Sequence, residues 1–213
     1  MLACCVAGSH HWDRYEVARV WAPQHLCCFI IGENPGAADS EYFYAKPESY
    51  AEDPVDVRRR LLRGLRDERL IAEPTLEAFR EAGFLFDHGI RCSLPRRVVR
   101  AEHRAAMRYA STRVGRAPHL VPFLSQAPTV WVMGHIASNA VANACEAAGC
   151  DPFPKKRRQI SKPPYPGELG PGSKFFLSRY LTRCYDAEVS NICRAFGVFA
   201  RARSISAGSS NFS

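Results

Sequence analysis

The sequence of 213 residues lacks several features that would assign it quickly to a class of protein. No apolar run approaches the length of about 20 residues that a membrane-spanning helix needs, so we expect no association with a membrane. Residues 1–7 lack the basic flank and the full apolar core of a signal peptide, which predicts an intracellular location. Neither the dinucleotide pattern Gly-x-Gly-x-x-Gly nor the Lys-Ser/Thr pair of a phosphate loop occurs. An α/β enzyme that binds a phosphate group at a glycine-rich loop is therefore the least favoured of the functions considered.

Cysteine is frequent, with nine residues, but the spacing typical of a metal site is missing. Zinc sites often contain Cys-x-x-Cys pairs, and no such pair occurs, so we expect no metal and no other cofactor. The chain is also too long to depend on a disulfide scaffold. Most of the cysteines are predicted to be small buried hydrophobic residues in a reducing compartment. Of the adjacent Cys27 and Cys28, one must face the core.

The net charge of +8 is unevenly distributed along the chain. Residues 1–151 hold 18 basic and 18 acidic residues, whereas residues 152–213 hold 11 basic and 3 acidic residues. A basic segment attached to a neutral domain favours a polyanionic partner such as single- or double-stranded DNA, although a solvated basic tail has the same composition. The residues that we expect to contact phosphates are Lys155, Lys156, Arg157, Arg158 and Lys162.

The centre of the sequence is an apolar run, residues 26–31, that stops abruptly at a glycine. The pattern predicts a buried strand that ends in a tight loop, residues 32–36, with the sequence Gly-Glu-Asn-Pro-Gly. In open α/β sheets, ligands bind at the carboxyl ends of the strands. The loop carries a carboxylate, Glu33, beside a carboxamide, Asn34, and its final glycine permits close approach of a ligand to the backbone.

Similar apolar runs at residues 84–90 and 130–133 predict two further strands beside the first. Together with the intervening helical patterns, they predict a three-layer α/β/α domain with a central, mainly parallel sheet of four strands. We expect this domain over residues 12–203, with a flexible N-terminus at 1–11 and a disordered tail at 204–213.

Two of the predicted helices matter for the argument below. The helix predicted at residues 56–69 carries an apolar stripe, and this pattern predicts that the arginines at 58–60 form a solvated face. The last helix is predicted at residues 188–199.

The Gly-Glu-Asn-Pro-Gly loop resembles the first active-site motif of the uracil-DNA glycosylase superfamily. It combines the Asn-Pro-Gly of the mismatch-specific and single-strand-selective branches with the Gly-Glu of the iron–sulfur branch. The resemblance implies that Asn34 orients a water molecule and that Glu33 acts as the base or as an electrostatic stabiliser. It also implies a base pocket lined by the rest of the loop, namely Gly32, Pro35 and Gly36.

The resemblance continues beyond the first motif, with departures. In the superfamily an aromatic ring downstream stacks on the extruded base, and Phe43 or Tyr44 lies at about that place. His88 stands where the family has a base-reading Asn, and histidine can also read a base edge. The second motif, usually His-Pro-Ser, is absent. The resemblance implies that the rigid loop at residues 163–167 takes its place, with Tyr165 next to the base.

The four cysteines of an iron–sulfur site do not align with this sequence, so we expect no cluster. The resulting expectation is a monomeric DNA glycosylase of base excision repair that removes uracil or another deaminated base. The alternative is a catalytically inactive module that has the glycosylase fold and binds nucleic acid.

Overall fold

The computed structural model describes eight stretches of the chain: residues 19–35, 42–44, 56–90, 119–149, 167–168, 173–179, 181 and 184–209. Among these, the side chains of 167–168 and 204–209 are not described. Several residues named above lie outside these stretches. They are Gly36, Tyr165, the basic residues of 155–162 and the predicted flexible N-terminus.

The centre of the protein is a sheet of four parallel strands in the order β2-β1-β3-β5. β1 (Cys28–Gly32) lies between β2 (Phe84–His88) and β3 (Thr129–Met133). β5 (Phe175–Ser178) follows β3, and a two-residue antiparallel strand, β4 (Gly167–Glu168), adds to the far edge. The three strands predicted to be neighbours are neighbours, because their fully apolar centres can be buried only inside a covered parallel sheet.

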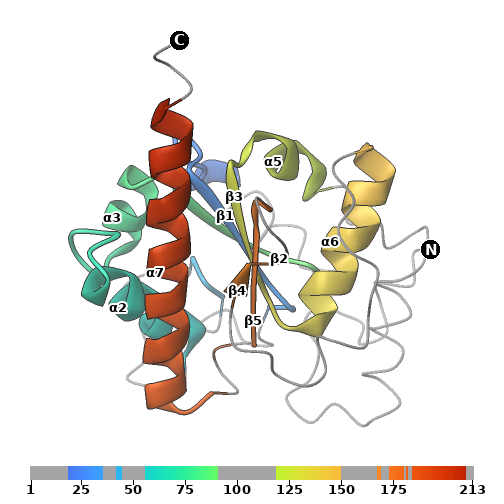
Figure 1. The fold of residues 1–213 in the computed structure, drawn as a ribbon. Coiled ribbons are helices and arrows are strands. Elements are labelled where there is room, and N and C mark those ends of the chain that lie inside the picture. Colours follow the sequence, from blue (N-terminus) through green and yellow to red (C-terminus); the bar gives the residue numbers. More distant parts are fainter. Residues whose placement is uncertain are drawn as a thin grey trace, which may run out of the picture.

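Helices cover both faces of this sheet, as Figure 1 shows. α2 (Val57–Asp67), α3 (Leu76–Glu81) and α7 (Asp186–Ser209) lie on one side. α6 (His135–Ala148) lies on the other side, with α5 (Val121–Gln126) next to it. The predicted three-layer α/β/α class is confirmed. In the described part of the chain, no helix is both long enough and apolar enough to span a membrane.

Helix α2 begins where Asp56 accepts a hydrogen bond from the backbone N–H of Arg59 at 3.1 Å, which is an ordinary side-chain cap. Its apolar stripe faces the core as expected, with Leu61, Leu62 and Leu65 all fully buried. The backbone of α2 approaches α7 closely at Gly64, where an added Cβ would lie 2.2 Å from the Sγ of Cys193. Only glycine leaves room for this approach of the two helices.

The prediction that residues 58–60 form a solvated face was wrong for two of its three arginines. Arg58 is 1% exposed, and its guanidinium lies 3.4 Å from the backbone carbonyl oxygen of Phe43. The side chain of Arg60 is 9% exposed. Arginine occupies these positions because its long stem can be buried while its guanidinium reaches backbone carbonyls, which a pattern of apolar residues does not reveal.

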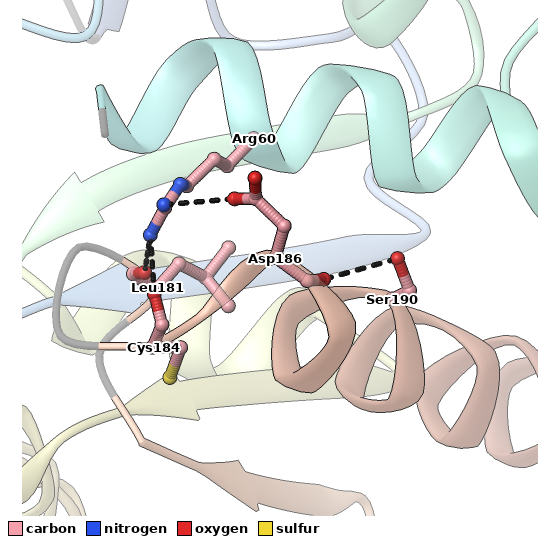
Figure 2. A network of polar contacts seen from close by, with 5 residues as sticks. All are labelled: Arg60, Leu181, Cys184, Asp186 and Ser190. Carbon is pink, nitrogen blue, oxygen red and sulfur yellow. Dashed lines mark hydrogen bonds and ion pairs between the residues drawn. The ribbon is translucent and has the colours of Figure 1, made fainter. Parts of the chain in front are cut away.

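Arg60 joins α2 to the segment that precedes α7 (Figure 2). Its Nη1 donates to the carbonyl oxygens of Leu181 and Cys184, each at 2.7 Å. Its Nη2 donates to Oδ1 of Asp186 at 2.9 Å, within the first turn of α7. One guanidinium therefore bonds two backbone carbonyls and a carboxylate, which ties α2 to the start of α7.

Helix α7 differs in length from the expectation, since it begins before residue 188 and continues to Ser209. The predicted disordered tail from 204 onward is therefore helical over its first six residues. These six residues are three serines, one isoleucine, one alanine and one glycine, so only Gly208 has a low helix propensity, and no proline interrupts them. A polar composition was misleading here, because it says little about a helix that is already nucleated on the core.

Four of the five described cysteines are buried, as expected for small hydrophobic residues. Cys28, Cys145, Cys184 and Cys193 are buried and form no disulfide, whereas Cys27 is exposed. Burial raises the pKa of the Cys193 thiol to about 12, and the nearby carboxylates of Glu68 and Asp67 add to the effect. The Cys193 thiol is therefore in the neutral, unreactive form at neutral pH.

Candidate functional site

The register of the two neighbouring strands brings the loop after β1 and the end of β2 together. Gly32 is the direct partner of His88 in the parallel pair β1–β2. The pairing continues past the strands, because the N–H of Gly89 donates to Gly32 at 2.8 Å and the N–H of Ile90 donates to the carbonyl oxygen of Glu33 at 3.0 Å. The first motif and His88 thus share the carboxyl edge of the sheet, where ligands of open α/β sheets bind.

Glu33 is held by the amino terminus of helix α6. Its side chain is buried, and Oε1 accepts the backbone N–H of His135 at 3.2 Å and of Ile136 at 3.5 Å. The N-cap residue of α6 is Gly134, which has no side chain to cap the helix, so Glu33 provides the cap from a distant part of the sequence. The positive end of the helix dipole favours a carboxylate at this place.

Gly134 is required for this contact. It has φ of 86°, and an added Cβ would lie 2.5 Å from Oε1 of Glu33. Of the two roles that the sequence left open for Glu33, this geometry favours electrostatic and structural support over that of a general base. The Oε1 atom of Glu33 is already engaged by two amide hydrogens of α6, so this oxygen is occupied by the helix.

Asn34 follows Glu33 and is half-buried, in contrast to the fully buried residue before it. Its Nδ2 donates to the carbonyl oxygen of Pro35 at 3.0 Å, which fixes the orientation of the amide. Its Oδ1 is a carbonyl oxygen with two lone pairs, the kind of group that can orient a water molecule. Gly32 and Pro35, also predicted to line the site, are buried on either side of this pair.

His88 ends strand β2 and is 3% exposed. Its backbone N–H donates to Oδ1 of Asp87 at 2.7 Å, and Nε2 of His119 lies 2.8 Å from its carbonyl oxygen. Its imidazole stacks on the ring of Tyr42, with centroids 5.9 Å apart and planes 30° apart. It also meets the edge of Phe86 at 5.0 Å. The side chain is therefore held between two aromatic rings at the sheet edge.

Phe43 and Tyr44, the rings expected to stack on a base, have other roles in the structure. Phe43 is 1% exposed and stacks on Phe86 in the core, with centroids 4.2 Å apart. The hydroxyl of Tyr44 donates to the carbonyl oxygen of Phe86 at 2.9 Å and accepts its N–H at 2.7 Å. Burial raises the pKa of Tyr44 well above its usual value, so the phenol is neutral and can make both bonds.

Tyr42 replaces them as the candidate aromatic residue, because its ring is the one that lies against His88. Phe43 and Tyr44, the two rings chosen from the sequence, instead pack on Phe86 and bond its backbone. Nothing in an irregular loop indicates which of its side chains turns toward the core and which toward the site.

Three further groups at the site were missed by reasoning from the sequence. They are Asp87, His119 and the amino terminus of α6. Asp87 stood inside an apparent strand, and His119 lies 31 residues from His88 in the chain. A signal existed only for the helix terminus, as a strand followed by Gly134 and a helix predicts exposed N–H groups near the carboxyl edge of a parallel sheet.

In the described part of the chain, no three His, Cys, Asp or Glu side chains are grouped closely enough to hold a metal ion. The chain matches no protein-family model, no curated protein and no solved structure at a significant level.

Proposed function

We propose that this protein is a DNA glycosylase that removes uracil or another deaminated base by hydrolysis of the N-glycosidic bond. The observation that carries the proposal is the pairing of Gly32 with His88. This register brings the Gly-Glu-Asn-Pro-Gly loop and the strand-end histidine to one edge of the sheet. The resemblance of the loop to the first motif of the uracil-DNA glycosylase superfamily supplies the chemistry.

The mechanism starts with a nucleotide turned out of the DNA stack, since the sugar carbon is otherwise out of reach. Asn34 accepts a hydrogen bond from a water molecule through Oδ1 and directs it at this carbon. Asn34 does not ionise at neutral pH, so it orients the water and does not deprotonate it. His88 recognises the edge of the base, and Tyr42 supports the imidazole from behind.

Bond cleavage develops positive charge on the sugar and negative charge on the departing base. The carboxylate of Glu33 provides a fixed negative charge near the sugar side of the loop, and the two amides of α6 hold it there. The oxygen of the water bonds to the sugar carbon, the electron pair of the N-glycosidic bond leaves with the base, and the proton of the water passes to the base anion. Glu33 contributes electrostatically and takes no proton.

The basic C-terminal third of the sequence supports DNA as the partner. Residues 152–213 carry the whole net charge, and phosphate contacts of this kind provide most of the affinity of sequence-independent binding. In this proposal the described domain contains the catalytic site, and the basic segment binds the phosphates of the DNA backbone.

A catalytically inactive nucleic-acid-binding module is the second candidate. Two observations favour it: the second motif is absent from the sequence, and the only carboxylate of the loop is engaged with helix α6. In this case the same edge of the sheet would hold a base without cutting its bond to the sugar.

The experiment that separates the two candidates is a base-release assay. The protein is incubated with labelled single- and double-stranded DNA that carries uracil, hypoxanthine or xanthine, and abasic sites are then cleaved with alkali. Strand cleavage at the modified position supports the glycosylase. DNA binding without cleavage on every substrate supports the binding module.

A further inference from the structure

Among the strands that the structure describes, β2 lies at the end of the sheet, and side chains bond the backbone groups on its outer edge. The hydroxyl of Tyr44 bonds both backbone groups of Phe86. One position further, Asp87 accepts the N–H of His88, and His119 reaches its carbonyl oxygen. Edge strands need such cover, because their backbone groups otherwise lack partners.

The bond from His119 fixes the position of its proton. A carbonyl oxygen can only accept, so the Nε2 atom of His119 must carry the hydrogen and donate it to His88 across 2.8 Å. His119 is half-buried and lies just before α5, so the core holds its backbone on one side.

This bond is the first link of a chain that crosses the candidate site. His119 donates to the carbonyl of the peptide that joins His88 to Gly89. The N–H of the same peptide, on Gly89, donates to the carbonyl oxygen of Gly32 at 2.8 Å. That carbonyl belongs to the peptide that joins Gly32 to Glu33. Hydrogen bonds in such a chain polarise and strengthen one another.

Helix α6 holds this chain from one face of the sheet. An added Cβ on Gly89 would lie 2.9 Å from the Cβ of Ala140 and 3.0 Å from the Cα of Ala137, so the helix packs directly on the peptide that His119 binds. The same helix receives the carboxylate of Glu33 at its amino terminus. The peptide after His88 is thus fixed by the helix on one face and by His119 at the edge.

We propose that His119 is a positioning residue of the candidate site, which sets the distance between His88 and the loop that carries Asn34 through the peptide of Gly89. This inference rests on the proposed function, because it assigns to His119 the alignment of the base-reading and water-orienting groups. His119 acts through His88 and need not touch the substrate.

Two substitutions of His119 separate positioning from simple stability. The amide nitrogen of glutamine lies at nearly the reach of histidine Nε2, whereas the side chain of asparagine is one carbon shorter. We expect His119→Gln to keep the bond to His88 and His119→Asn to lose it. The same pair of substitutions at His25, which is exposed, provides the control.

The first measurement needs no DNA. In amide NMR spectra, His119→Asn should move the proton resonance of Gly89 upfield and speed its hydrogen exchange, because its bond to Gly32 loses the cooperative support. His119→Gln should leave both close to those of the wild type. Equal changes in the two variants, or none in either, would overturn the proposed chain.

The second measurement is excision of uracil from a single-stranded oligonucleotide. His119→Asn should lower kcat by about tenfold, the rate equivalent of one hydrogen bond, with a smaller change in KM. His119→Gln should restore kcat. If His119 has only a structural role, both variants will lose thermal stability while kcat at a permissive temperature stays that of the wild type, and the inference is wrong.

The two proposals fail in distinguishable ways. If the wild type releases no base, the proposed function fails. The quantity measured in place of kcat is then the binding preference for an oligonucleotide that contains uracil over one that contains thymine. A preference lost in His119→Asn and kept in His119→Gln would still support positioning of the site. A preference unchanged in both variants would overturn it.

Discussion

The contact between Glu33 and helix α6 predicts different results for two substitutions of the same carboxylate. Glu33→Ala removes the acceptor for the N–H of half-buried His135 at 3.2 Å and of buried Ile136 at 3.5 Å. A lost N-cap costs about 0.5–2 kcal/mol and a lost hydrogen bond to a charged group about 1.5–3 kcal/mol, so we expect a loss of about 2 kcal/mol.

Glu33→Gln keeps an oxygen at the same place and removes only the charge. The interaction of that charge with the helix dipole is worth about 0.3–1 kcal/mol, so this variant should be clearly more stable than Glu33→Ala. For a protein of this size, 1 kcal/mol corresponds to about 2–4 °C in Tm. Thermal unfolding of the two variants measures the difference directly.

The same pair decides the role of Glu33 in excision. If Glu33 supports the loop, Glu33→Gln should excise within about fivefold of the wild type, in line with about 1 kcal/mol of lost electrostatic stabilisation. If Glu33 is the general base, Glu33→Gln should lose about 10²–10⁴-fold and resemble Glu33→Ala in activity.

Glu77 provides the control, since it is an exposed acidic residue in the first turn of helix α3. Glu77→Ala and Glu77→Gln should differ by no more than about 0.5 kcal/mol. Equal Tm values for the two Glu33 variants would show that the cap contributes nothing, and the reasoning about α6 would then be wrong.

Three further predictions concern other parts of the protein. Arg60→Ala should lower the unfolding free energy by about 2–4 kcal/mol in urea titrations, because two carbonyls each lose a charged donor at 2.7 Å. Arg63→Ala, at an exposed position of the same helix, should change it by less than about 0.5 kcal/mol. The Cys193 thiol, with its pKa raised from 9.0 to about 12, should make the unfolding free energy fall as pH rises through that interval, and Cys193→Ala should flatten this dependence. Joint replacement of Lys155, Lys156, Arg157 and Arg158 by Ala should weaken DNA binding and reduce its salt dependence by about one unit of log–log slope per lost phosphate contact.

The sign of the pH effect follows from which state holds the proton. Above pH 9.0 the thiol of the unfolded chain ionises, while the buried thiol of Cys193 stays protonated up to about pH 12. The folded state then binds more protons than the unfolded state, so its stability falls with rising pH, by at most about 1.4 kcal/mol per pH unit. A steeper loss of stability with pH in Cys193→Ala would contradict this assignment. For the basic run, a salt dependence of DNA binding that is unchanged after its four residues are replaced would contradict the predicted phosphate contacts.

The central part of the fold could be predicted from the sequence because its signals are local and strong. Short, mostly apolar runs that end at Gly32 and near Gly89 are typical of buried parallel strands. The carboxyl ends of neighbouring parallel strands must meet at one edge. The meeting of the first motif with His88 therefore followed from strand order alone.

The details of the site depend on contacts between distant residues, which no local pattern encodes. Glu33 binds a helix that begins 102 residues later, and Arg60 binds carbonyls 121 and 124 residues away. The choice among Tyr42, Phe43 and Tyr44 was decided by how one loop packs on β2. In each case a polar or aromatic residue has a tertiary partner that overrides its usual preference for solvent or ligand.

The most direct test of the proposed function is the rate of base release by Asn34→Ala compared with the wild type, on the oligonucleotide that the wild type cleaves best. Asn191→Ala, at an exposed position of helix α7, is the matched control and should retain the full rate. The proposal predicts a loss of about 10²-fold or more for Asn34→Ala, with DNA binding preserved, because phosphate contacts elsewhere provide most of the affinity. An unchanged rate in Asn34→Ala would contradict it and move the catalytic centre away from the loop after β1.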